Sequence, residues 1–329
     1  MVIKFVDLSQ KGVATLTKTG ATPVAVEKVE TEYGDQYKFK YDYTALAGAE
    51  FEFRAAEDIT TADGTTRAHK GDVVATGTTD AQGQIQTPEL YLGKYTATEI
   101  SAPTGFIMNP DPIAFDLKYA GQAVTVTATS LEAKNDFQQL DITLNKQEES
   151  ISDWKDNLPE IKNVAANGQV FGLFTQGETT IGDTVIPSES LVATTTVKDG
   201  KAEFGAIQLP EGYYYVKELD AGEKHDLNTT MYGFHFHTTD NEKIKHIDLN
   251  DSKVINNKLH ENELSFKKIN EVATLVSGKG YSYAITGNAA GAIFELLDAD
   301  KKVIQTITVG KDSIGSIKHL PVGTFYLRE

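Results

Sequence analysis

The sequence predicts an all-β protein built from tandem β-sandwich modules that follow one another head to tail in a rod. Many short runs alternate apolar and polar residues, as strands with one buried face do, and clusters of Gly, Pro, Asn and Asp separate these runs. Three sequence patterns also recur in the same order along the chain, which points to a repeated structural unit. We find no convincing amphipathic helix, although the polar insertions 58–70 and 148–163 could hold a helical turn or two.

Length and composition limit the class of protein. A chain of 329 residues is too long for one small sandwich and suits two or three modules of roughly 100 residues each. The formal net charge of −16 argues against nucleic acid or an anionic membrane as a partner, because both carry negative charge. The absence of cysteine excludes disulfides, thiolate catalysis and cysteine-based metal sites. No apolar run approaches the roughly 20 residues of a membrane-spanning helix.

The two ends of the sequence look like cut strands. Met1 leads directly into the strand-like alternation of residues 3–7, without the apolar core of a signal peptide. The sequence stops at Glu329 in the middle of another strand pattern. We therefore expect the chain to be a segment of a longer protein whose signal peptide and anchor lie outside it.

Two of the recurring patterns are strands that follow a glycine. The first has a glycine, two further residues and then Phe, and it reads LAGAEFEF at 46–53, ANGQVFGLF at 166–174 and AAGAIFELL at 289–297. The second starts with glycine and ends in Glu, and it reads GKYTATE at 93–99, GYYYVKE at 212–218 and GTFYLRE at 323–329. Their regular spacing predicts three copies of one module.

The third pattern is an alternating apolar strand that ends on a lysine. Strand side chains alternate between faces, so each lysine, and by the same parity each final Glu of the second pattern, lies on the inward face. An inward charge needs a partner, because an unpaired buried charge costs several kcal/mol or more. Eleven residues before each lysine stands an Asn or Asp. The lysines are Lys18, Lys146 and Lys268, the glutamates are Glu99, Glu218 and Glu329, and the residues before the lysines are Asp7, Asn135 and Asn257.

These markers divide the chain into modules. Each module ends on a strand with Asn or Asp and passes through a short polar linker into the lysine strand of the next. We expect residues 1–10 to be the terminal strand of a preceding module or a linker, 11–137 to be module 1, 138–258 to be module 2, and 259–329 to be module 3, which lacks its last strand.

With these motifs the chain resembles the Cna-B (SpaA-like) family of Gram-positive pilins and surface adhesins. The resemblance rests on LAGAEFEF, on YTATEISAPTGF at 95–106 and on YYYVKELDAG at 213–222. YTATEISAPTGF is similar to the family's Glu-Ala-Pro-Gly-Tyr signature with Phe106 in the aromatic place, whereas Asp220, Ala221 and Gly222 depart from it in module 2. The resemblance covers nearly the whole chain and implies immunoglobulin-like (Cna-B type) sandwiches.

The resemblance also implies an isopeptide bond inside each complete module, between the first-strand lysine and the last-strand Asn. Module 1 would join Lys18 to Asn135 with Glu99 promoting the reaction, and module 2 would join Lys146 to Asn257 with Glu218. Asn256 stays open as the acceptor in module 2, because spacing alone chooses between the two neighbours. Module 3 has Lys268 and Glu329 without an acceptor, and Asp7 is an unpaired acceptor candidate.

The chemistry that the resemblance implies is physically coherent. Burial in an apolar core favours the neutral forms of amine and acid. A neutral amine can then attack the Asn carbonyl, while the glutamic acid hydrogen-bonds to that carbonyl and shuttles protons. Each bond forms once, so the protein would not be an enzyme, and no cofactor is implied. His235 and His237 share a strand face without a third ligand at a convincing spacing, so we expect no metal site.

Three functions fit a chain of this kind. The first is a structural stalk or pilin-like segment of a Gram-positive surface protein, held together by its isopeptide bonds. The second is an adhesin module that binds host matrix protein or glycan, for example through Tyr213, Tyr215, Tyr281 and Tyr283. The third is an accessory β-sandwich of a carbohydrate-active enzyme, which ranks last because no catalytic carboxylate pair is identifiable.

The stalk hypothesis also predicts partners and location. The partners would be other modules of the same surface protein or fibre, with host matrix protein or glycan as a further possibility and with no membrane contact by this segment. Residues 2–10 of one molecule could complete module 3 of the next by strand exchange, because a sandwich without its last strand exposes an edge. The protein would lie outside the cell, anchored to the cell wall.

Overall fold

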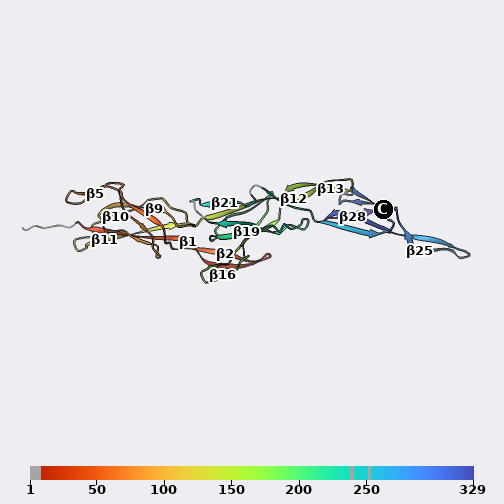
Figure 1. The fold of residues 1–329 in the computed structure, drawn as a ribbon, viewed down its shortest axis with the longest axis horizontal. Helices are drawn as coiled ribbons and strands as arrows, with labels where there is room; N and C mark the ends of the chain where they lie inside the picture. The colour runs from red at the N-terminus through yellow and green to blue at the C-terminus, as the bar shows by residue number, and fades with distance from the viewer. Residues whose placement is uncertain (1–8, 238–240, 251–252) are drawn as a thin grey trace, which may run out of the picture.

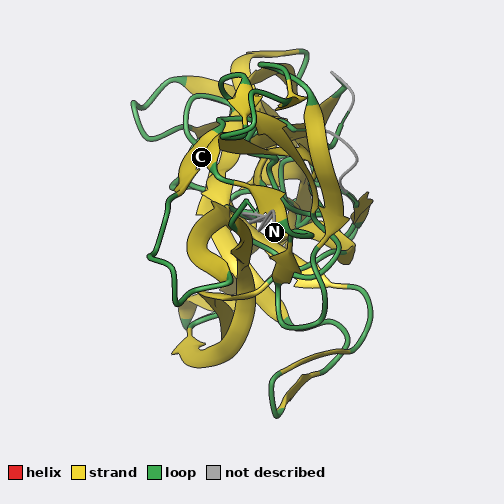
Figure 2. Cartoon of the chain, turned by 90° about the vertical axis from the view of Figure 1, so that its left-hand side faces the viewer, coloured by secondary structure: helices red, strands yellow, loops and turns green. Residues whose placement is uncertain are grey.

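The computed structural model describes residues 9–237, 241–250 and 253–329. The strands form three groups that lie one after another along the long axis of the molecule (Figure 1). Figure 2 shows strands and loops, and no helix occurs in these described ranges. The prediction of an all-β rod of tandem immunoglobulin-like sandwiches is therefore confirmed. We call the three groups module 1 (β1–β11), module 2 (β12–β22) and module 3 (β23–β29).

The strands of module 1 are β1 (Lys11–Thr31), β2 (Gly34–Ala45), β3 (Glu50–Ala55), β4 (Ile59–Thr60), β5 (Thr66–Ala68), β6 (Val73–Thr78), β7 (Gln84–Gln86), β8 (Leu90–Tyr91), β9 (Gly93–Ser101), β10 (Ile113–Leu117) and β11 (Val126–Asn135). Those of module 2 are β12 (Gln139–Lys155), β13 (Leu158–Ala165), β14 (Val170–Thr175), β15 (Thr179–Ile181), β16 (Thr184–Ile186), β17 (Leu191–Thr196), β18 (Lys201–Ile207), β19 (Gly212–Asp220), β20 (Tyr232–Phe236), β21 (Ile244–Asp248) and β22 (Val254–Asn257). Those of module 3 are β23 (Glu261–Lys267), β24 (Ile269–Val276), β25 (Gly280–Asn288), β26 (Ile293–Leu297), β27 (Val303–Thr308), β28 (Ile314–Pro321) and β29 (Tyr326–Arg328).

Modules 1 and 2 share one sheet topology. One sheet of module 1 has the strand order β10-β9-β3-β6, and the same order recurs in module 2 as β20-β19-β14-β17. In the facing layer the first strand pairs in parallel with the last strand, β1 with β11 and β12 with β22. The first and last strands of each module are therefore direct neighbours, although their paired residues lie more than 100 positions apart in sequence.

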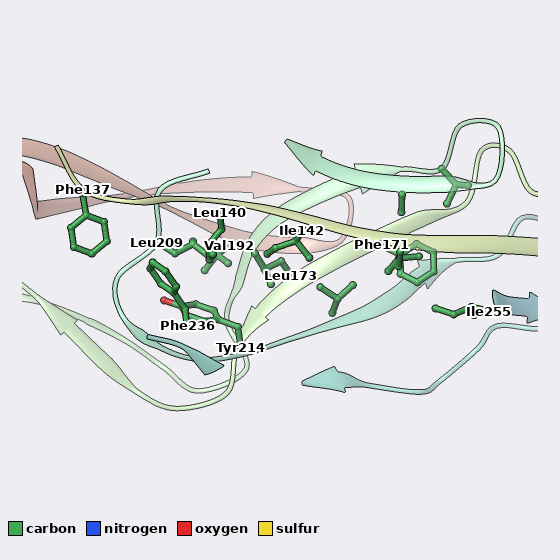
Figure 3. Close-up of a cluster of buried hydrophobic side chains, with 14 of the residues drawn as sticks. Phe137, Leu140, Ile142, Phe171, Leu173, Val192, Leu209, Tyr214, Phe236 and Ile255 are labelled. Atoms are coloured by element: carbon green, nitrogen blue, oxygen red, sulfur yellow. The ribbon is translucent and has the colours of Figure 1, made fainter. Parts of the chain in front are cut away.

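The cores form where the alternating apolar residues face one another. In β1 the buried positions alternate from Gly12 to Gly20, so Ala14, Leu16 and Lys18 all point inward. The core of module 1 gathers Phe51, Phe53, Tyr95 and Phe115 around these residues. The core of module 2 is larger and continues into the end of module 1 through Ala21 and Phe137 (Figure 3). Burial of these side chains is the main source of stability for each sandwich.

Both polar insertions are β-hairpins and not helical turns. Residues 58–70 contain the short pair β4 and β5. Residues 148–163 lie in the long antiparallel pair of β12 and β13, which turns at Asp156 and Asn157. Asp156 and Asn157 have positive φ values of 51° and 63°. This backbone conformation is typical of a tight hairpin turn and is incompatible with a right-handed helix.

Module 3 is open on one side. Its lysine strand β23 pairs with β28, and no described strand lies beside it as β11 lies beside β1. Leu264 is 48% exposed and Leu327 is 41% exposed. The inward parity predicted for Glu329 therefore does not bury its side chain, which is 52% exposed, since no described strand pairs with β23 on its other side.

Candidate functional site

Lys18 is fixed in the core of module 1 by its strand and by a glycine. The backbone N–H of Lys18 donates to Gly83 O at 2.7 Å, and its carbonyl accepts from Leu46 N at 3.0 Å. Gly83 has φ +70°, and a Cβ there would lie 2.3 Å from the Lys18 carbonyl oxygen. The strand that carries the lysine can therefore pass this turn only because position 83 has no side chain.

Replacing Gly83 by Ala should displace Lys18 and reduce the fraction of chains that form the predicted Lys18–Asn135 bond, with a stability loss of about 1–3 kcal/mol. Gly64 is a matched control, because it also has positive φ, +78°, yet nothing lies within 4 Å of a Cβ built there. The measurement is peptide mapping together with the melting temperature of each variant. If Gly83→Ala and Gly64→Ala lower the melting temperature and the bond yield equally, the close contact between position 83 and the Lys18 carbonyl has no special role.

The three side chains predicted in module 1 meet in its core. Lys18 Nζ donates to Asn135 Oδ1 at 2.5 Å and lies 3.2 Å from Glu99 Oε1. The same Glu99 oxygen accepts from Asn135 Nδ2 at 2.8 Å. Lys18, Glu99 and Asn135 are 0%, 2% and 1% exposed, so the set is closed to water.

Module 2 repeats this arrangement. Lys146 Nζ donates to Asn257 Oδ1, and it lies 3.3 Å from Glu218 Oε1. Asn257 Nδ2 donates to the same glutamate oxygen at 2.8 Å. These three side chains are at most 3% exposed. The structure therefore brings Asn257 to the lysine, and not its neighbour Asn256.

Burial changes the acid–base behaviour of both lysines. Desolvation in the core lowers the pKa of Lys18 below its usual value, and the neighbouring carboxylate of Glu99 opposes this only in part. The pKa of Lys146 is lowered for the same reason, with Glu218 opposing. A lowered pKa increases the share of neutral amine, which is the nucleophilic form.

The lowered pKa of Lys18 predicts that stability depends on pH in an Asn135→Ala chain, which cannot form the predicted Lys18–Asn135 bond. The folded state then holds fewer protons on Lys18 than the unfolded state does, between the lowered pKa and the ordinary value of 10.5. The stability of module 1 should therefore rise with pH in that window. The measurement is the melting temperature from pH 7 to 10, and adding Lys18→Met should flatten the slope. If the melting temperature still rises with pH after Lys18→Met, the pH dependence does not come from Lys18.

The glutamates are oriented by backbone groups that the motifs did not reveal. Glu99 Oε2 accepts from Asn109 N at 2.8 Å, and Glu218 Oε2 accepts from Asn228 N at 2.8 Å. Each donor lies ten residues after its glutamate, and this shared spacing was the available signal. The other oxygen, Oε1, is left to face the lysine and the amide nitrogen. The sequence-based expectation of a hydrogen bond from Glu to the Asn carbonyl is not met, because Oε1 accepts from Nδ2 instead.

An aromatic ring covers each lysine. Lys18 Nζ lies 5.4 Å from the ring centroid of Phe51, and Lys146 Nζ lies 5.9 Å from that of Phe171. Phe294 has the same relation to Lys268, at 6.0 Å. These are the Phe residues of the first repeated pattern, so the repeat signalled their position but not their contact with the amine.

The third set is present only in part. Lys268 Nζ lies 2.7 Å from Glu329 Oε2, and the side chains are 27% and 52% exposed. No Asn or Asp of the described ranges completes the set with a hydrogen bond to Lys268. Asp7 lies outside the described residues, as do residues 2–8 of the predicted exchange strand.

The side chains that the binding hypotheses singled out are scattered. Tyr213 is 60% exposed and stacks on His235 with the ring centroids 4.2 Å apart, whereas Tyr215 is buried. Tyr281 and Tyr283 stand on an exposed hairpin of module 3. No group of three or more His, Asp or Glu that could hold a metal ion occurs among residues 9–237, 241–250 and 253–329.

Comparisons with known proteins agree with this fold. A family model described as the SpaA prealbumin-like fold domain matches residues 36–132. No curated protein matches the chain. Among solved structures, the Bacillus anthracis TIE protein has a TM-score of 0.58 at 18% identity, over 97% of this chain and 45% of that one. The major pilin subunit BcpA of Bacillus cereus has a TM-score of 0.31 at 16% identity, over 97% and 87%. A streptococcal ancillary pilin has a TM-score of 0.27 at 17% identity, over 76% and 63%.

Fold and site together define a tandem β-sandwich protein with a buried Lys, Glu and Asn set in each of two modules. The match shows a SpaA-like domain of prealbumin-like fold over residues 36–132, in agreement with the motifs of that part of the chain. The chain spans about 45% of the TIE protein, and the likeness to that protein is one of fold. No helix in the described part of the chain has the length and apolarity to cross a membrane.

Proposed function

We propose that modules 1 and 2 each form an isopeptide bond within themselves and that the chain is a stalk or pilin-like segment. One observation carries this proposal: a single glutamate oxygen contacts both the attacking and the leaving nitrogen. Glu99 Oε1 lies 3.2 Å from Lys18 Nζ and 2.8 Å from Asn135 Nδ2. A group in this position can move a proton from one nitrogen to the other.

The reaction balances with the groups present. A proton passes from the lysine ammonium to the glutamate carboxylate, which leaves a neutral amine and a neutral acid. The amine nitrogen attacks the Asn Cγ and forms the new C–N bond. The acid gives its proton to Nδ2 as the old C–N bond breaks, and the carboxylate takes a proton from the attacking nitrogen. The products are the amide, one ammonia molecule and the protonated glutamate, so no cofactor takes part. Proximity in a closed core makes this otherwise slow exchange feasible.

The position of the bonds suits a load-bearing role. Each bond would join the first strand of a module to its last, across 117 residues in module 1 and 111 in module 2. Force would enter at the start of β1, cross the Lys18–Asn135 bond and leave through the linker to β12. The residues between the two bonded positions would carry no load. This is why we place the chain in a stalk that holds other parts of a surface protein away from the cell.

The proposal extends to organisation and location. We propose module limits at 11–137, 138–258 and 259–329, because the strand groups begin with β1, β12 and β23 close to these limits. The resemblance to Cna-B (SpaA-like) domains and the SpaA-domain match over residues 36–132 support an extracellular Gram-positive surface protein whose partners are other modules of the same protein or fibre. A host-binding role finds less support, since the candidate tyrosines do not form one surface.

Peptide mapping tests the proposal directly. A protease digest of the denatured chain should contain one branched peptide that links Lys18 to Asn135 and one that links Lys146 to Asn257. Asn256→Ala should leave the second branched peptide in place, whereas Asn257→Ala should remove it. Linear peptides alone would contradict the proposal.

A further inference from the structure

In modules 1 and 2 a loop follows the glutamate strand and returns toward the strand that carries the acceptor Asn. We call this loop the clip, which comprises residues 102–109 in module 1 and 221–228 in module 2. Each clip begins three positions and ends ten positions after its glutamate. Within those ten positions the two modules share only the Ala at the third and the Asn at the tenth. The clips therefore differ in most side chains, yet both end on an asparagine, Asn109 or Asn228.

The clip of module 1 is hydrogen-bonded to the residues that follow the acceptor Asn135. Ile107 N donates to Asp136 O at 2.9 Å, and Asp136 is the residue directly after the acceptor. Gln138 N donates to Gly105 O, also at 2.9 Å. These two bonds fix the backbone of the clip relative to the acceptor strand.

The clip of module 2 repeats this pairing with different side chains. Asp226 N donates to Lys258 O at 2.9 Å, and Lys258 directly follows the acceptor Asn257. His260 N donates to Lys224 O, also at 2.9 Å. Because the same two backbone bonds form between unlike residues, the path of the clip does not depend on those side chains.

The asparagine at the end of each clip closes a turn with its side chain. Asn109 Oδ1 accepts from Asp111 N at 3.1 Å, and Asn228 Oδ1 accepts from Thr230 N at 2.9 Å. This bond to the N–H two residues further on is an Asx turn, which fixes the local backbone. The backbone N–H of the same Asn donates to Oε2 of the glutamate, at 2.8 Å in both modules. The side chain therefore holds the turn that presents this N–H to the glutamate.

The orientation of the glutamate matters because one of its oxygens has to serve two nitrogens. Glu99 Oε1 lies 3.2 Å from Lys18 Nζ and 2.8 Å from Asn135 Nδ2, and the corresponding distances in module 2 are 3.3 Å and 2.8 Å. A carboxylate that rotates or shifts loses one of these two contacts. A hydrogen bond that holds Oε2 keeps Oε1 in place. Misplacing a reacting group by about 1 Å can slow a reaction by about 100-fold.

We propose that Asn109 and Asn228 are positioning residues for the two isopeptide reactions. Each acts through the glutamate of its module and not on a reacting atom. The Asx turn fixes the end of the clip, the clip is bonded to the residues after the acceptor, and the N–H of the Asn orients the carboxylate. The inference rests on the proposed isopeptide bonds and adds a residue to the lysine, glutamate and acceptor of each module.

The rate of bond formation in each module of one chain tests this role. Chains made in a short pulse of cell-free synthesis would be quenched in acid at increasing times, and the two branched peptides would be quantified after digestion. Asn109→Ala should slow the module 1 bond about 10–100-fold and leave the module 2 bond at the wild-type rate. Asn228→Ala should do the reverse. The unchanged module in each chain serves as the internal reference.

A conservative variant and a matched control separate positioning from a loss of folding. Asn109→Asp keeps the side-chain oxygen that closes the turn, so it should restore nearly the wild-type rate. Asp298→Ala is the control, because Asp298 Oδ1 also accepts from an N–H two residues on, that of Asp300 at 2.9 Å, in a turn of module 3. It should leave both rates unchanged. The melting curve of Asn109→Ala shows whether module 1 is folded at the reaction temperature, and Asn228→Ala carries the same test in module 2.

Two results would overturn the positioning role while leaving the isopeptide bonds in place. The first is a module 1 bond that forms at the wild-type rate in a folded Asn109→Ala chain. The second is a bond that forms as slowly in Asn109→Asp as in Asn109→Ala, because the side-chain oxygen would then not be what matters. Failure of the proposed function looks different, since the wild-type chain itself would give only linear peptides.

Discussion

Glu99→Gln should leave module 1 without its isopeptide bond, and Glu218→Gln should do the same in module 2. Glutamine keeps the volume of the side chain, but it cannot accept a proton from the lysine and return one to the leaving nitrogen. Each substitution should therefore retain one ammonia molecule per chain and remove one branched peptide, while the other module reacts as before. The expected loss of reaction is nearly complete, because removing a general acid–base group typically costs 10²–10⁴-fold in rate.

The matched control is Glu132→Gln, which changes an exposed glutamate of β11, the strand that also carries the acceptor Asn135. It should leave both branched peptides in place. A chain with Glu99→Gln that still forms the Lys18–Asn135 bond would show that the glutamate is a structural partner only.

The second large effect concerns mechanical extension. In the bonded chain, pulling on the ends of module 1 cannot extend the residues between Lys18 and Asn135, which are 117 positions apart. In the Glu99→Gln variant those residues become free to extend once the module unfolds. Single-molecule force measurements should then show a new extension step of about 400 Å, at 3.3–3.6 Å per residue. The wild-type chain should lack this step.

Thermal unfolding should show the same bond in another way. By analogy with a disulfide that closes a loop of this length, each bond should contribute about 4–5 kcal/mol. The melting temperature of module 1 should therefore fall in Glu99→Gln and stay unchanged in Glu132→Gln. In the force measurement, an extension step in the wild-type chain equal to that of Glu99→Gln would contradict a load-bearing Lys18–Asn135 bond.

Much of the fold could be predicted from the sequence because its information is local and repeated. Alternation in β1 placed Ala14, Leu16 and Lys18 on one face, and the structure buries all three. The same parity placed Tyr95, Ala97 and Glu99 inward, and these are buried too. Strand periodicity therefore predicted which side chains lie in the core, including the charged ones.

Other features depend on contacts between distant segments, which a single sequence does not encode locally. The polar composition of residues 148–163 suggested an insertion, but Trp154 is packed on the core of module 3, more than 100 residues later. The parity of Glu329 predicted burial, yet its side chain is 52% exposed because no described strand covers that side of module 3. The predicted hydrogen bond from Glu99 to the Asn135 carbonyl is not formed either, because Lys18 binds Oδ1 and leaves Nδ2 to donate to Glu99.

The most direct test of the central claim is the intact mass of the denatured wild-type chain at isotopic accuracy. Two completed bonds predict a mass lower than that of the 329-residue sequence by two ammonia molecules. A mass equal to that of the unmodified sequence would contradict the account, and the buried Lys, Glu and Asn sets would then be hydrogen-bonded polar networks in the cores of modules 1 and 2.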